Sequence, residues 1–254
     1  MSSVKQSVHL DLELRQLLLP KLGHEASECE DVIAVDTQTG RFAVADGATE
    51  AFAARDWAER LAKQWVLRQS TLTIEEFRNW VAAEGRELHD SWNGLSLSWY
   101  AEAKARTGSF AAFVGLELDL NSESPSWKAV ALGDSCLLHR RGDVLIKSLP
   151  LTRSESFNNA PILVASNSAL HESSMKSVVI DAGNCESGDV LLLMTDAVAS
   201  WYLKCFENDE LEDHFFAQSD EKLIEFFDRE RLAGRIRNDD LAIVRIEIKE
   251  RSRG

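Results

Sequence analysis

The segment Arg41-Phe42-Ala43-Val44-Ala45-Asp46-Gly47 sets the expectation for the whole chain. It is a short β-prone run that ends in an aspartate and a glycine. A strand that ends in a carboxylate holds the carboxylate oxygens on a rigid frame at the rim of a sheet. The glycine lacks a side chain, so its backbone carbonyl can approach a bound ion closely. The segment therefore predicts an oxygen-ligand site at one end of a sheet.

Three further acidic points have the same design. Glu30-Asp31 precedes a β-prone run, Asp196 follows the apolar run 190–195, and Asp239-Asp240 opens the last β-prone run. Converging carboxylates repel one another unless a hard divalent cation neutralises them. Oxygen ligands of this kind suit Mg²⁺ or Mn²⁺.

Each acidic point also has a purely structural interpretation. Asp46-Gly47 fits a hairpin turn, and Asp196 fits the N-cap of the following helix. Asp239-Asp240 fits a solvated turn, and Glu30-Asp31 fits surface charge. Short motifs match by chance in a chain with 42 acidic residues. Taken singly, each point favours the structural interpretation, so the order and context of all four must decide.

Composition indicates an ordinary globular protein. The chain has 254 residues, and 28 Lys+Arg against 42 Asp+Glu give a net charge of −14. A polyanion is disfavoured as a partner of nucleic acid or of an anionic membrane surface. The longest apolar stretch, 190–194, is far too short to span a bilayer. The four cysteines form no CxxC pair and the first ten residues no cleavable leader, so we expect a cytoplasmic protein with free thiols.

Hydrophobic patterning predicts an α+β fold, with strands, two long helices, strands, helices and a last strand. Predicted strands cover residues 32–35, 41–45, 109–118, 127–132, 136–140, 144–147, 178–181, 189–195 and 241–248. Predicted helices cover residues 50–68, 74–105, 197–206, 209–217 and 220–232. Thr73 and Glu76 form a capping-box start for the second helix. Five of the seven tryptophans lie on the first two helices, where we expect them in the core.

Residues 151–176 show little periodicity and are rich in Ser and Asn. We interpret them as a long loop or flap, and such loops are often functional. No internal repeat or linker interrupts the chain.

The order of these motifs resembles the PP2C-type (PPM) metal-dependent Ser/Thr protein phosphatases, from about Gly23 to Glu247. No single motif is diagnostic, but several occur in the family's order over a chain of the right length. The motifs are Glu30-Asp31, Phe42 to Gly47, Gly108-Ser109-Phe110, Leu132-Gly133-Asp134-Ser135, Gly188-Asp189 to Asp196, and Asn238-Asp239-Asp240 to Val244.

The resemblance implies a single domain over residues 1–254, with a flap at about 152–176. It implies a four-layer α-β-β-α sandwich of two antiparallel sheets flanked by helix pairs. It also implies a site for two Mn²⁺ or Mg²⁺ ions at one end of the sandwich, with a third, weaker ion beside them. The implied metal-site residues are Glu30, Asp31, Asp46, Gly47, Asp134, Asp196 and Asp239.

The resemblance also assigns roles within that site. Asp46 would bridge the two ions and Gly47 would offer its carbonyl to one of them. Asp196 and Asp239 would bind the other ion, and these two with Asp46 are the implied catalytic residues. Glu30 and Asp31 would hold metal-bound waters or complete the site. Asp134 matches the position linked to the third ion.

The sequence departs from the family pattern at three places. Ala26 stands where the family often has an arginine that grips the substrate phosphate, and the nearby His24 is better explained as a surface residue. Ala48 follows Gly47 where the family usually has a glycine-rich run. Ala197 replaces a glycine after Asp196. These changes bear on substrate handling more than on metal binding.

The implied activity is hydrolysis of phosphoserine or phosphothreonine in proteins by a metal-activated water. The partner would be a phosphorylated protein, such as the target of a Ser/Thr kinase. No cysteine lies beside an Arg-rich phosphate loop, so a covalent phosphoenzyme is not indicated. A basic cluster near the C-terminus could guide the substrate, although a solvated helix end explains it better: Arg229, Arg231, Arg235 and Arg237.

Two alternatives stay open at this point. Ala26 and Ala48 favour a non-catalytic phosphatase-like module that binds a phosphoprotein or a kinase, whereas the intact Asp46, Asp196 and Asp239 favour an enzyme. A metal-dependent phosphodiesterase is a second enzymatic alternative without a motif of its own.

Overall fold

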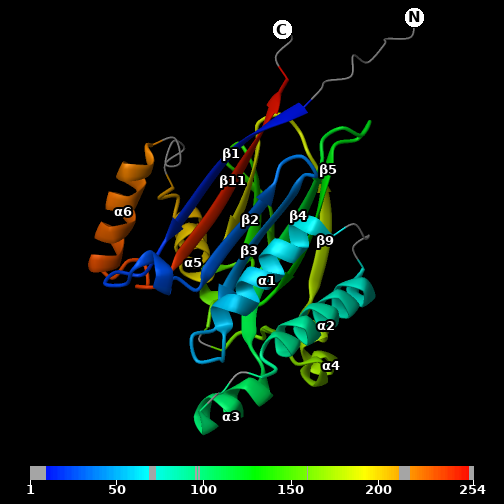
Figure 1. Cartoon of the computed structure of the whole chain (residues 1–254). Coiled ribbons are helices and arrows are strands. Elements are labelled where there is room, and N and C mark those ends of the chain that lie inside the picture. The colour runs from blue at the N-terminus through cyan, green and yellow to red at the C-terminus, as the bar shows by residue number, and fades with distance from the viewer. Residues whose placement is uncertain are drawn as a thin grey trace, which may run out of the picture.

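Two antiparallel sheets form the centre of the computed structural model, which describes residues 10–68, 73–94, 96, 98–158, 160–211 and 218–251 (Figure 1). The first sheet has five strands. Their spatial order is β1 (Leu10–Leu19), β11 (Leu241–Glu250), β10 (Asp189–Met194), β6 (Cys136–Arg141) and β7 (Val144–Leu149).

The second sheet has six strands. Five follow the order β2 (Asp31–Asp36), β3 (Arg41–Gly47), β4 (Phe110–Asp119), β5 (Ser126–Leu132) and β9 (Val179–Asn184). The short β8 (Val164–Ala165) pairs with the start of β4. The predicted α+β class is therefore confirmed.

The core lies between the sheets and on their outer faces. Leu191 and Leu193 of β10 pack with Val114 and Leu116 of β4 in one buried cluster, so the two sheets face each other. Leu192 alternates with these residues and packs in a second cluster with the helices outside the first sheet. Because both faces of β10 are buried, its sequence is apolar without alternation.

Helices cover the outer face of each sheet (Figure 1). α1 (Ala54–Leu67) and α2 (Ile74–Ser91) cover the second sheet, with Trp57 and Trp65 fully buried. Gly115 of β4 makes room for Trp65, since a Cβ at Gly115 would lie 2.5 Å from the indole ring. α5 (Asp196–Glu207) and α6 (Asp220–Leu232) cover the first sheet. No helix in the described ranges has the length and apolar character needed to cross a membrane.

The predicted helix over 74–105 is wrong as one element. α2 begins as predicted, with the Thr73 hydroxyl accepting from the Glu76 amide at 3.2 Å, but it ends at Ser91. Gly94 has a φ of +85°, a left-handed conformation that breaks the helical path. A separate helix, α3 (Trp99–Thr107), then starts at the cap Ser98. It has no buried residue, and Trp99 is 83% exposed, so its predicted place in the core is wrong.

The strand β1 precedes the first predicted element, so the prediction that structure begins near residue 32 is wrong. β1 pairs with β11 along its whole length. Leu10 faces the core between the sheets, whereas Leu17 and Leu19 face the outer cluster. Because the two halves of the strand bury opposite faces, its leucines do not follow a single period of two.

The segment 151–176 contains more structure than a loop. Besides β8 it holds α4 (His171–Ser174) and several 3-10 turns. The Trp57 indole donates to the Val164 carbonyl at 2.9 Å, and buried His171 Nε2 lies 2.8 Å from the Ala165 carbonyl oxygen. Gly85 of α2 packs so closely that a Cβ there would lie 2.1 Å from the Ser166 oxygen. The second half of this segment is therefore bound to the body of the protein.

The other predicted elements are present, with ends that differ by a few residues. The predicted helix over 209–217 is the exception: its described residues, 209–211, are not helical, and Asp209 has a φ of +56°. Residues 212–217 lie outside the described part of the chain.

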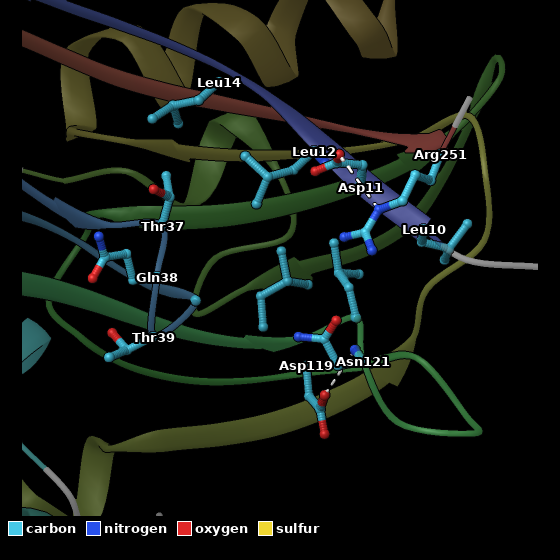
Figure 2. Close-up of a pocket in the computed structure, with 13 residues that line it drawn as sticks. Leu10, Asp11, Leu12, Leu14, Thr37, Gln38, Thr39, Asp119, Asn121 and Arg251 are labelled. Atoms are coloured by element: carbon cyan, nitrogen blue, oxygen red, sulfur yellow. Dashed lines mark hydrogen bonds and ion pairs between the residues drawn. The ribbon is translucent and has the colours of Figure 1, made fainter. Parts of the chain in front are cut away.

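The end of the sandwich where β1 begins and β11 ends holds a cavity of about 540 Å³ between the sheets (Figure 2). Leucines from β1 and β4 line it together with the β2–β3 turn, residues 37–40. Arg251 and Asp11 form an ion pair of 3.8 Å at its mouth. The predicted acidic residues lie at the opposite end of the strands.

Candidate metal centre

Three of the predicted carboxylates meet at the end of the sandwich away from the termini. Asp46 ends β3, Asp134 follows β5, and Asp196 is the first residue of α5. Each offers one oxygen atom, and the three atoms lie within 4.8 Å of one another. The chain thus brings together acidic groups from three distant segments, at a spacing that one cation could bridge.

The turn between β5 and β6 aims Asp134 at this point. Gly133 has a φ of +107°, and a Cβ there would lie 2.6 Å from the Ala112 side chain, so only glycine fits the turn. Asp134 is 4% exposed and therefore removed from bulk water. Its carboxyl is therefore buried among the other carboxyls of the centre.

Asp31 lies beside the three carboxylates, directly opposite Asp46 in the β2–β3 ladder. The Thr195 hydroxyl donates to Asp31 Oδ2 at 2.7 Å and accepts from the Ala242 amide at 2.9 Å. Thr195 thus joins β2, β11 and the end of β10. This linking role of Thr195 was not predicted, although Thr195 is the one polar residue in the run 190–195.

Glu30 is fixed at the rim of the centre. Its carboxylate accepts from the Thr49 hydroxyl at 2.5 Å, and its amide donates to Asp240 Oδ2 at 2.8 Å. The other oxygen of Asp240 accepts from the Lys21 amide at 2.8 Å. Asp240 therefore braces the loop before β2.

Gly47 is required by packing as well as by any ion. A Cβ at this position would lie 2.8 Å from the carbonyl carbon and oxygen of Ala54, where α1 begins. The Gly47 amide donates to the Glu30 carbonyl at 3.2 Å. The start of α1 therefore explains the missing side chain, independently of the predicted carbonyl contact to a metal.

Arg237 enters the centre from the segment before β11. Its guanidinium contacts Asp196 and lies 2.9 Å from Asp239 Oδ2, so it joins two of the predicted ligands. The interpretation of its basic cluster as a solvated helix end is wrong for Arg231 and Arg237, whereas Arg229 and Arg235 are exposed. Arg231 is 5% exposed and donates to the carbonyls of Leu19 and Asp239, while Arg235 binds Glu230 through two N–H groups.

The acidic groups of the centre resist ionisation. Burial raises the pKa of Asp31 and of Asp46, and the neighbouring carboxylates raise it further. Burial, followed by the charge of Asp196, raises the pKa of Asp134 to about 7. Burial also raises the pKa of Asp196 itself, although Arg237 opposes the shift. Full ionisation of these carboxyls would exceed the single positive charge of Arg237, and a bound divalent cation is what stabilises such an ionised set.

The position of the missing phosphate-gripping arginine is occupied differently. Ala26 begins a 3-10 turn, Ala26–Glu28, and is exposed. The guanidinium of Arg55, on the exposed side of α1, donates to the Ser27 carbonyl in this turn. His24 is at the surface, with Nδ1 3.8 Å from Glu28, as the sequence suggested. A cation from another element thus lies beside residue 26.

No protein-family model matches the sequence, and no curated protein matches it. Solved structures do match its fold. PppA, described as a key regulatory component of T6SS in Pseudomonas aeruginosa, is 16% identical with a TM-score of 0.58, over 93% of this chain and 97% of its own. The catalytic domain of the serine/threonine protein phosphatase PstP, in complex with two manganese ions, is 17% identical with a TM-score of 0.60, over 95% of this chain and 100% of its own.

A third solved structure carries the family name. It holds the PP2C phosphatase domain of SpoIIE from Bacillus subtilis with a fragment of its regulatory domain. It is 14% identical with a TM-score of 0.51, over 96% of this chain and 65% of its own. At these identities the likeness concerns the fold. The fold that the motif order predicted is confirmed: the chain has the fold of the PP2C-type Ser/Thr phosphatases.

Proposed function

We propose that this chain is a metal-dependent protein phosphatase that hydrolyses phosphoserine and phosphothreonine. The observation that supports the proposal best is the convergence of Asp46, Asp134 and Asp196 within 4.8 Å at the end of a PP2C-type sandwich. Buried like charges at this spacing are costly without a counter-ion.

The donor set fits Mn²⁺ or Mg²⁺. All the candidate ligands are oxygen atoms, and the described cysteines and histidines lie outside the cluster. Asp46, on which the charges of Asp31, Asp196 and Asp134 act, would serve two ions. Asp196 and Asp239 would hold one of them, and Glu30 and Gly47 would complete the other. Asp134 would hold a third, weaker ion.

Bound divalent cations supply a nucleophilic water at neutral pH and neutralise the phosphoryl oxygens. The residues of the chain orient this chemistry. Thr195 fixes the Asp31 carboxylate, Thr49 fixes that of Glu30, and the Asp240 brace holds the loop that carries both acids. Arg237, half exposed beside Asp196 and Asp239, would be a cation available to an entering phosphate. We further propose that residues 1–254 act as one domain and that residues 152–176 form a flap over the approach to the site.

The test uses purified protein with an aryl phosphate and a phosphothreonine peptide, each with and without Mn²⁺. Turnover of both substrates that depends on the metal and is abolished by a chelator supports a phosphatase. Tight Mn²⁺ binding by calorimetry without turnover of either substrate would instead support a non-catalytic phosphoprotein-binding module. Cleavage of a phosphodiester but of neither monoester would replace the proposal with a phosphodiesterase.

A further inference from the structure

A second cavity lies directly beside the carboxylate centre. It has a volume of about 230 Å³ and shares Asp196 and Arg237 with the centre. One wall is the exposed side of α5. The other walls are the segments 157–158 and 235–237. A substrate bound at the centre therefore lies next to this cavity.

The helix α5 gives the cavity a fixed length. Asp196, Ser200 and Lys204 are spaced by four residues, so they lie in one row along the helix. At 1.5 Å of rise per residue, the backbone positions of Asp196 and Lys204 are about 12 Å apart. An extended peptide covers that distance in three or four residues, at roughly 3.3–3.6 Å per residue.

The far part of this cavity is cationic. Lys204 is exposed, and within the described ranges no carboxylate lies within ion-pair distance of its ammonium group. Arg235 is paired with Glu230, but its side chain is 58% exposed toward the same cavity. Arg237 stands at the boundary with the centre. Such a group of cations is unusual on a chain with a net charge of −14, and it is complementary to an anion.

We propose that this cavity binds an acidic group located three or four residues from the phosphoresidue of a peptide substrate. Lys204 would be the main contact and Arg235 the second. The inference rests on the proposed phosphatase function and adds a substrate class to it. The acidic group is a carboxylate or a second phosphoryl group, since both are anions that an ammonium and a guanidinium can bind.

The experiment compares matched phosphothreonine peptides in a neutral background. One series places Glu or Gln at the third or fourth residue on either side of the phosphothreonine, and a second series places phosphoserine there. We expect kcat/KM to be about two- to fivefold higher with Glu than with Gln on one side, the range of a partly exposed ion pair. The ratio should fall as NaCl is raised from about 0.05 M to about 0.5 M, because salt screens exposed charges.

Lys204→Gln should bring the Glu/Gln ratio close to one. Lys222→Gln is the matched control, because it removes the same charge from an exposed lysine of α6 that does not line this cavity. It should leave the ratio unchanged. Because each variant is judged by a ratio measured on one preparation, a change in folded fraction cancels.

The outcomes separate the two proposals. Faster turnover with Glu supports a carboxylate ligand, and faster turnover with phosphoserine alone assigns the cavity to doubly phosphorylated substrates. Metal-dependent turnover of an aryl phosphate with equal rates on all peptides would overturn the acidic subsite and leave the phosphatase function standing. A ratio that survives in Lys204→Gln would also overturn it. Absence of turnover on every substrate would remove the phosphatase function, and the subsite with it.

Discussion

The strand β10 has a buried aspartate at each end, and the two carboxylates differ in the charges that surround them. At its start, Asp189 is 0% exposed, and Arg141 donates to its two oxygens at 2.7 and 2.9 Å. The Glu186 amide donates to it at 2.8 Å, and His139 Nε2 lies 2.9 Å away. Just past the other end, Asp196 meets Asp46 and Asp134, with Arg237 as the nearby cation.

The pKa values follow this difference. Burial alone would raise the pKa of Asp189, but the hydrogen bonds from Arg141, Glu186 and His139 outweigh it, and the pKa is lowered. At the other end, burial and mutual repulsion raise the pKa of Asp46, Asp134 and Asp196. Burial therefore does not by itself mark a functional carboxylate. The mark is burial without enough cations from the chain, and this distinguishes a binding centre from a structural ion pair.

Asp46→Asn gives the sharpest test of this comparison. It removes a carboxyl on which the charges of four other carboxylates act, so metal-dependent kcat/KM should fall by about a thousandfold. The metal-free variant should melt about 2–4 °C higher than the native chain, because repulsion is relieved. Aryl phosphate kinetics and thermal melts in a chelator measure the two effects. Near-normal turnover would exclude Asp46 as the central ligand.

Asp189→Asn should have the opposite signature. The change leaves the partly exposed Arg141 and the buried His139 without their anion, which should cost about 2–4 kcal/mol of unfolding free energy. Urea unfolding measures this loss. Turnover per folded molecule should stay close to native, because Asp189 lies at the other end of the strand. A stable but inactive variant would contradict the structural role.

The pH dependence of stability should also separate the two ends. Asp134 has a folded pKa of about 7 against an ordinary value of 3.8, so the metal-free folded protein holds the extra proton between these values. Its unfolding free energy should therefore fall, by on the order of 1–3 kcal/mol, as the pH rises from about 4 to about 7. Asp189, whose pKa is lowered, contributes stability above its ordinary pKa that is lost as the pH falls through its folded pKa.

Melts across this pH range, without metal, test the sign. Asp134→Asn should flatten the fall toward pH 7, and saturating Mn²⁺ should do the same, because bound metal favours ionised ligands. An identical slope in Asp134→Asn and in the native protein would show that the Asp134 carboxyl does not carry the effect.

The smallest expected effect concerns Arg237. This arginine offsets part of the charge on Asp196 and Asp239, so it competes with a metal for both. Arg237→Gln should tighten Mn²⁺ binding by about two- to fivefold, as expected for a half-exposed ion pair. Arg235→Gln is the control, since Arg235 pairs with Glu230 away from the centre. Weaker binding in Arg237→Gln, measured by calorimetry, would show that Arg237 assists the ion instead.

The sequence was most informative where local pattern and tertiary structure agree. The apolar run of β10 and the alternation of β11 each predicted a strand because burial imposes them directly. The strand β1 has no single period because its halves bury opposite faces, and the apolar spacing that continues beyond Gly94 hides the break there. In α3 the aromatic Trp99 is exposed, so side-chain type alone gave the wrong environment.

The centre was predicted as a set of residues but not as an arrangement. The motif order named Asp46, Asp134 and Asp196, which the fold brings within 4.8 Å. It did not reveal that Arg237 joins Asp196 to Asp239, nor that Thr195 holds Asp31. The Arg237–Asp196 and Thr195–Asp31 contacts link residues 41 and 164 positions apart. Such pairings depend on strand order, which hydrophobic periodicity does not encode.

The β2–β3 hairpin links the two ends of the sandwich in a way that limits how the sequence can vary. Its turn, residues 37–40, lines the cavity between the sheets at the end away from the carboxylates. The same turn sets the register that places Asp31 opposite Asp46. A Cβ at Gly40 would lie 2.1 Å from the Leu118 oxygen, so the turn is confined as well as short. Surface turns ordinarily accept insertions. Here a slip of one residue would turn the Asp31 side chain to the opposite face of the sheet. The length of this remote turn is therefore constrained, although none of its residues touches the carboxylates.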